Sequence, residues 1–204
     1  NDKNMSYDPN IHHRRSIRLK GYDYSQAGMY FVTICIQNRD YLLGKIIDDQ
    51  MILNDAGKMV EKWYLELENK FSDIECGVYV VMPNHFHCII INNGNGNPNI
   101  KKKSSSTIGA DLRVCPDDIG ENEMGETEMG EHIGSPLRAV TQWFKTMTTN
   151  EYIRCVKTLG WQRFNGKLWQ RNYWEHIIRN QKSFNVISDY IINNPKNWNN
   201  DKLK

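Results

Sequence analysis

The segment between Gly77 and Ile91 constrains the fold most, because it predicts two neighbouring strands joined by a turn. Gly77–Met82 and His85–Ile91 are short apolar runs rich in β-branched residues. Pro83 and Asn84 separate the two runs, and both residue types favour turns. Any candidate chemistry carried by this segment is therefore expected to sit on a strand.

Other segments predict further strands and a first helix. A buried strand is expected over Met29–Gln37, and a short second strand near Gly44–Leu53. Asn54 is a predicted helix N-cap, because apolar residues then recur at helical spacing to about Phe71.

The last third of the chain adds two helices. One is predicted from Leu137 through Tyr152, and Lys167–Ile178 is expected to be extended at least in part. Ser183 opens a final helix that Pro195 ends. Strands and helices mixed in this order predict an α+β sandwich, in which helices pack on an antiparallel sheet.

Length and composition exclude several classes of protein. A chain of 204 residues with 39% hydrophobic residues has enough apolar material for a core, so wholesale disorder is excluded. No run reaches the roughly 18 apolar residues of a membrane span, and the N-terminal Asn1-Asp2-Lys3 shows no signal segment. We therefore expect a cytoplasmic protein without a membrane partner. The five cysteines form no CxxC pair, which favours reduced, mostly buried thiols.

Residues 93–135 differ from their surroundings. They begin with an Asn/Gly-rich stretch, contain a degenerate Gly-Glu-x-Glu-Met repeat, and carry four basic and eight acidic residues. Few of them could offset the entropy lost on ordering, so a flexible acidic insertion is expected here. The predicted organisation is a basic N-terminal arm (1–28), one domain (29–198) interrupted by this insertion, and a tail (199–204).

The region from Pro136 to the end is strongly basic. It holds twelve basic and four acidic residues, a net charge of +8, together with eleven aromatic residues. Basic side chains interleaved with aromatic ones favour contact with a nucleic-acid backbone and its bases. A solvated basic face over an aromatic core would give the same composition.

His85-Phe86-His87 is the sharpest chemical signal. Alternate residues of a strand point to the same face, so the two imidazoles are expected side by side, with Phe86 directed into the opposite layer. Two converging imidazoles can bind a divalent metal, with a third ligand from elsewhere. The alternative is one exposed and one structurally satisfied histidine.

Three motifs resemble a known family. Val80 to Ile91 resembles the HUH segment of single-tyrosine transposases, in which U is a hydrophobic residue. Arg15 to Arg39, and Leu168 to Asn180 followed by Asp189-Tyr190-Ile191-Ile192-Asn193-Asn194-Pro195, are similar to the REP-associated tyrosine transposase branch. The resemblance covers most of residues 14–198 outside the insertion. It implies a ferredoxin-like core and the cleavage and joining of single-stranded DNA, often at hairpins.

The resemblance also implies site residues. Tyr190 matches the nucleophile of that family, and His85 and His87 match its metal ligands, with Mg²⁺ or Mn²⁺ as the expected ion. Asn194, four residues after Tyr190, stands where related transposases carry a glutamine ligand, one methylene longer. A helix places Tyr190 and Asn194 on one face, which is compatible with a shared site.

Several residues are candidates for contact with DNA. The DNA backbone is expected to contact four basic residues near the N-terminus, which are Arg14, Arg15, Arg18 and Lys20. Ser16, Ile17 and Leu19 lie between them in the sequence. Unpaired bases could stack on Trp169, Arg171, Tyr173 and Trp174, and the alternative is that at least half of these side chains belong to the core. His176 could support the site from behind its ligands, or be a partly buried histidine without such a role.

These features predict a metal-dependent DNA transposase that forms a 5′-phosphotyrosine, with single-stranded or hairpin DNA as its partner. Two alternatives stay open: a DNA-hairpin-binding protein that no longer cleaves, and a metal phosphodiesterase that uses water. The sequence does not decide between a monomer and a homodimer.

Overall fold

The computed structural model describes residues 22–94 and 136–204. The predicted DNA contacts Arg14, Arg15, Arg18 and Lys20, most of the proposed N-terminal arm, and the proposed insertion apart from its first two residues lie outside the described residues. No helix in the described part of the chain combines the length and the apolar character needed to cross a membrane.

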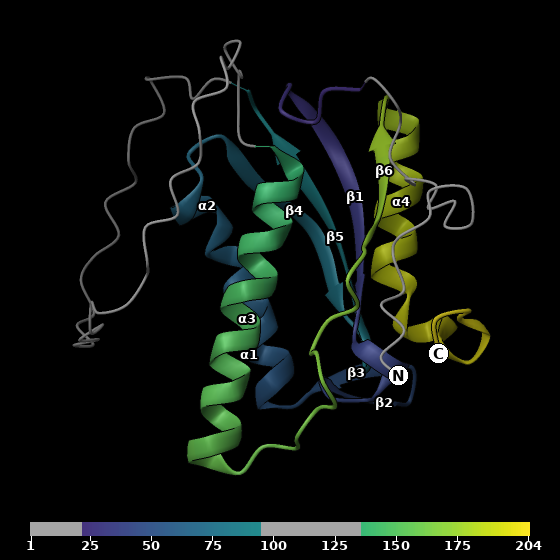
Figure 1. Cartoon of the computed structure of the whole chain (residues 1–204). Helices are drawn as coiled ribbons and strands as arrows, with labels where there is room; N and C mark the ends of the chain where they lie inside the picture. The colour runs from purple at the N-terminus through teal and green to yellow at the C-terminus, as the bar shows by residue number, and fades with distance from the viewer. Residues whose placement is uncertain (1–21, 95–135) are drawn as a thin grey trace, which may run out of the picture.

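A four-stranded antiparallel sheet forms the centre of the fold (Figure 1). Its strands are β1 (Gly28–Cys35), β4 (Ile74–Val81), β5 (His85–Asn92) and β6 (Trp174–Ile178), in the spatial order β4-β5-β1-β6. Helices α1 and α3 each connect strands of this sheet. The predicted α+β sandwich, with helices on an antiparallel sheet in a ferredoxin-like order, is confirmed.

One face of the sheet packs against α1 (Asp55–Leu65), α2 (Leu67–Lys70) and α3 (Leu137–Leu159). Asn54 caps α1 as predicted, because its side chain accepts a hydrogen bond from the Gly57 N–H. The main core lies between these layers, where Phe86 of β5 meets Tyr64 of α1 and stacks on Phe144 of α3. Helix α3 extends beyond the predicted Tyr152 and ends at Gly160, whose φ of +68° suits a left-handed C-cap.

The opposite face carries α4 (Gln181–Asn193), which contacts β4 and β5 (Figure 1). A second apolar cluster of Ile89, Ile178 and Ile191 joins α4 to the sheet. The helix begins two residues before the predicted Ser183, because Asn180 accepts a hydrogen bond from the Ser183 N–H and serves as the N-cap. It ends just before Pro195, which opens the 3-10 helix η2 (Pro195–Asn200).

The prediction of one strand near Gly44–Leu53 was wrong. This segment forms a separate hairpin of β2 (Gly44–Ile47) and β3 (Gln50–Leu53). The turn residues Asp48 and Asp49 both have positive φ, 49° and 59°, which is the backbone of a two-residue hairpin turn. The first strand also ends at Cys35, before the predicted Gln37, because η1 (Gln37–Arg39) follows with positive φ at Asn38 and Arg39.

The four described cysteines are free thiols, and three of them, Cys35, Cys88 and Cys155, are buried. For these residues the expectation of reduced, mostly buried cysteines agrees with the structure.

Candidate metal centre and tyrosine

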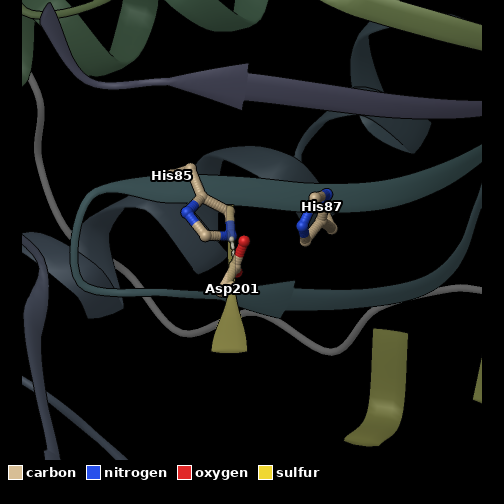
Figure 2. Close-up of side chains that lie close together, drawn as sticks. All are labelled: His85, His87 and Asp201. Atoms are coloured by element: carbon tan, nitrogen blue, oxygen red, sulfur yellow. Dashed lines mark ion pairs between the residues drawn. The ribbon is translucent and has the colours of Figure 1, made fainter. Parts of the chain in front are cut away.

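Strand β5 places both imidazoles on the face of the sheet that carries α4 (Figure 2). His85 and His87 are 0% and 1% exposed, and their ring centroids lie 4.6 Å apart. Phe86 between them points into the main core on the other face. The arrangement expected from the two-residue period of a strand is present, and both histidines are buried, which disagrees with the alternative of one exposed histidine.

The hydrogen bonds of Asn84 show which ring nitrogen of His85 carries the proton. The Asn84 side-chain N–H donates to the Leu203 carbonyl at 2.9 Å, so its Oδ1 is the atom that faces His85 Nδ1 at 2.7 Å. An amide oxygen only accepts, and therefore His85 Nδ1 carries the hydrogen. His85 Nε2 is left with a lone pair directed into the site.

His87 is oriented by β1. Thr33 pairs with His87 across the two strands, and its hydroxyl lies 2.7 Å from His87 Nδ1. The Phe31 ring stacks on the imidazole, with ring centroids 5.4 Å apart. His87 Nε2 then faces the Tyr190 hydroxyl at 3.4 Å.

Asp201 completes a group that the sequence reasoning missed. It follows η2, and its Oδ2 lies 3.5 Å from His85 Nε2 (Figure 2). Ligand atoms of His85, His87 and Asp201 lie within 4.8 Å of one another. Residues 199–204, predicted to be a tail, fold back here, because Asn84 and Arg39 both donate to the Leu203 carbonyl. No spacing in the sequence signals this contact.

Burial favours the neutral form of both imidazoles. Burial lowers the pKa of His85 to about 2, with smaller effects from His87 and Arg39, and burial lowers the pKa of His87 to about 3. The contact between His85 and Asp201 is an ion pair only when His85 is protonated, and burial disfavours that form. It brings a nitrogen lone pair and a carboxylate oxygen together, and both atoms are buried without a hydrogen-bond partner.

Asn194 lies at the same site. It is the C-cap of α4, is 2% exposed, and its Oδ1 is also buried without a hydrogen-bond partner. Its side chain lowers the pKa of Tyr190 and raises the pKa of His85, so it lies close to both residues. The structure therefore offers two oxygen donors, Asp201 and Asn194, where the sequence reasoning expected Asn194 alone.

Tyr190 projects from α4 at the edge of this group and is 44% exposed. Its ring lies edge-on to His87 and Phe31, with centroid distances of 5.4 and 6.1 Å. Burial and the negative charge of Asp201 raise the pKa of the Tyr190 hydroxyl, while Asn194 lowers it. The phenol thus stays protonated at neutral pH in the absence of a cation.

The remaining predicted site residues lie elsewhere. Trp169 is 4% exposed and donates its indole N–H to Thr148, so of the two roles left open for it, base stacking or packing in the core, its ring takes the second. Arg171 is exposed beside α3, on the far side of the sheet from Tyr190. His176 is exposed on β6 and pairs in register with Phe31, but within the described residues it makes no hydrogen bond to either site histidine.

A solved structure has the same fold. The REP-associated tyrosine transposase bound to a REP hairpin superposes with a TM-score of 0.50 at 18% sequence identity, covering 89% of this chain and 73% of that one. The fold is therefore that of a tyrosine transposase, and the predicted resemblance is confirmed at the level of the fold. No family model matches the chain.

A relative is also found by sequence. An uncharacterized protein of Haemophilus influenzae is 37% identical over 202 residues, which span 97% of this chain and 96% of that protein. The chain belongs to the same family as this protein.

Proposed function

We propose that this chain is a metal-dependent enzyme that cleaves and rejoins single-stranded or hairpin DNA through a covalent 5′-phosphotyrosine on Tyr190. One observation carries the proposal. Buried atoms with lone pairs but no hydrogen-bond partner, namely His85 Nε2, Asp201 Oδ2 and Asn194 Oδ1, gather beside a tyrosine hydroxyl. Buried polar atoms without partners are rare in folded proteins, because each costs about 1–3 kcal/mol.

A divalent cation fits this donor set. Two neutral imidazoles, a carboxylate and an amide oxygen form a mixed nitrogen and oxygen group, and Asn84 and Thr33 fix the ring orientations from behind. His85, His87 and Asp201 would hold the ion, with Asn194 as an additional oxygen donor. The mixed set favours Mn²⁺, with Mg²⁺ as the other candidate. When bound, the cation supplies positive charge that stabilises negative charge developing on a DNA phosphate.

The chain's own residues provide the nucleophile and its position. Tyr190 Oη would attack the scissile phosphorus, forming the Tyr190–phosphate bond as the bond to the 3′-oxygen breaks. The phenol loses its proton and the departing 3′-oxygen gains one, so one ester replaces another and no ATP is consumed. Phe31 and His87 hold the tyrosine ring against the sheet, so the hydroxyl stays beside the histidine pair. Rejoining reverses the step with a different 3′-OH.

Two observations support DNA as the substrate. The region from Pro136 onward carries a net charge of +8, which suits a polyanion. The structural neighbour is bound to a REP hairpin, and we extend that class of ligand to this chain as part of the proposal.

The experiment uses a pool of 3′-labelled hairpin oligonucleotides with randomised flanking segments, incubated with Mn²⁺ or Mg²⁺. Wild type should give a labelled protein–DNA band that resists denaturant. Tyr190→Phe removes one oxygen and keeps the ring contacts, so it should fold normally and give no band. Tyr41→Phe, at an exposed tyrosine outside the site, is the matched control and should keep the band.

The other outcomes separate the alternative functions. A phosphodiesterase that uses water would cut the DNA in wild type and in Tyr190→Phe, and neither would give a covalent band. A protein that only binds hairpins would retain DNA without cutting it. A band that persists in Tyr190→Phe and disappears in Tyr173→Phe would assign the nucleophile to Tyr173.

A further inference from the structure

A groove of about 890 Å³ runs along α3, on the opposite side of the sheet from Tyr190. One wall is a face of α3 from Arg138 to Ile153, and the other is the segment from Phe164 to Tyr173. Figure 1 shows the chain after α3 turning back and rising toward β6. The groove therefore lies between a rigid helix and the strand-like segment that leads into the edge of the sheet.

All the charged residues that line the groove are basic. Four of its lining residues are basic and none is acidic; the basic residues are Arg138, Lys145, Lys167 and Arg171. The lining also includes the amide side chains of Gln142 and Asn150, which can donate hydrogen bonds to phosphate oxygens. This chemistry is complementary to a polyanion.

The four basic side chains of the groove differ in their contacts. The Lys145 ammonium donates to the backbone carbonyls of Gln170, Arg171 and Asn172, at 3.0, 3.4 and 3.4 Å, so it ties the second wall to α3. Arg138, Lys167 and Arg171 are exposed. Within residues 22–94 and 136–204, no ion pair to a carboxylate occupies any of these three side chains. As far as the described residues go, their charges are open to a ligand.

The segment that forms the second wall of the groove leads into the edge strand of the sheet, beside the candidate centre. Its last lining residue, Tyr173, is followed by Trp174, the first residue of the edge strand β6. Thr33 pairs with Trp174 of β6 on one side and with His87 of β5 on the other. Residues paired in register share a face, so Trp174 and His87 both lie on the face that carries Tyr190. Trp174 is 61% exposed there. A strand leaving the groove thus meets an exposed indole before it reaches the tyrosine.

We propose that this groove binds the phosphate backbone of single-stranded DNA that flanks the cleavage point, and that the strand passes around β6 over Trp174 to Tyr190. The inference rests on the proposed function. Single-stranded DNA is the favoured occupant because the path turns sharply around an edge strand, whereas duplex DNA is stiff over about 150 base pairs. An exposed tryptophan on the path also suits stacking on an unpaired base.

The test compares two charge-reversal pairs that change the net charge equally. Arg138→Glu/Arg171→Glu alters the groove, and Lys70→Glu/Lys157→Glu alters exposed lysines of α2 and α3 that do not line it. Fluorescence anisotropy measures Kd for a 30-nucleotide single strand and a 30-base-pair duplex over a salt series. Circular dichroism melting checks that each variant is folded.

The groove pair should weaken single-strand binding at least tenfold, and the control pair by about twofold or less. The slope of log Kd against log salt should fall by about 1.4 in the groove pair, because each lost single-strand phosphate contact removes about 0.7. Equal losses in both pairs, or an equal loss for duplex and single strand in the groove pair, would overturn the inference.

A separate readout distinguishes failure of this inference from failure of the proposed function. The covalent band of wild type tests the tyrosine chemistry and does not depend on the groove variants. A missing band combined with a selective loss of single-strand binding would refute the chemistry and keep the groove. A normal band with no selective loss would refute the groove alone.

Discussion

His85 Nε2 and Asp201 Oδ2 face each other across 3.5 Å, and both atoms are buried without a hydrogen-bond partner. The Asn84 amide places the His85 proton on Nδ1, and burial lowers the pKa of His85, which disfavours a second proton. Two electron-rich atoms held this close in a buried site repel each other unless a cation lies between them. This pair therefore supports the proposed metal centre more directly than the His-Phe-His spacing does.

Asp201→Asn should separate metal binding from stability. The new amide can donate to His85 Nε2, so the metal-free variant should be as stable as wild type or more stable, by about 1 kcal/mol. The gain in melting temperature on adding Mn²⁺ should largely disappear. Thermal melts with EDTA and with Mn²⁺ measure both effects. Asp189→Asn, an exposed carboxylate of α4, is the control. Full stabilisation of Asp201→Asn by Mn²⁺ would remove Asp201 from the centre.

Thr33→Val tests the orientation of His87. The substitution keeps the shape of the side chain but removes the hydroxyl that contacts His87 Nδ1 at 2.7 Å. We expect a 10–100-fold loss of Mn²⁺ affinity, as for other groups that orient metal ligands, and a destabilisation of about 1–3 kcal/mol. Isothermal titration with Mn²⁺ and urea unfolding measure the two effects. Thr146→Val, on the exposed surface of α3, should change neither.

Asn84→Ala should disturb the same site by removing two hydrogen bonds of the Asn84 side chain. It removes the acceptor for His85 Nδ1 and the donor that holds the Leu203 carbonyl, so Asp201 loses part of its support. We expect destabilisation of about 1–3 kcal/mol and weaker Mn²⁺ binding. Asn69→Ala, whose side chain bonds to Glu66 on the surface, is the matched control. Unchanged Mn²⁺ affinity in Asn84→Ala would contradict the assigned role.

The metal-free protein should lose stability as pH falls below neutrality. The pKa values of His85 and His87 are lowered to about 2 and 3, whereas an unfolded histidine titrates near 6.5. The unfolded state therefore binds protons first as pH falls, so stability is full above about 6.5 and declines below it. Between pH 7.5 and 5.5 the two histidines together should cost roughly 2–3 kcal/mol.

Urea unfolding in EDTA at the two pH values measures this loss. Stability that stays flat over this range would show that the two imidazoles are not held neutral, and the lone pair inferred on His85 Nε2 would lose its support.

The sequence by itself determined the local geometry on which the site is built. The two-residue period of a strand set His85 and His87 on one face and Phe86 on the other, and helical spacing placed Tyr190 and Asn194 one turn apart. These relationships depend only on residues close in the chain. The hairpin at Asp48 and Asp49 was missed because an Asp-Asp pair lacks the glycine that usually marks such a turn.

Only the tertiary structure decided which distant side chains share the site. Asp201 reaches His85 because η2 turns the end of the chain back and Asn84 holds the Leu203 carbonyl, a contact between residues 119 positions apart. Trp169, for which the sequence left both base stacking and a core position open, is buried because its segment bonds to the end of β1 and packs on α3. Periodicity fixes the face of an element to which a residue belongs. The burial of that face and the group opposite it follow from the packing of segments far apart in the chain, and no local pattern encodes this packing.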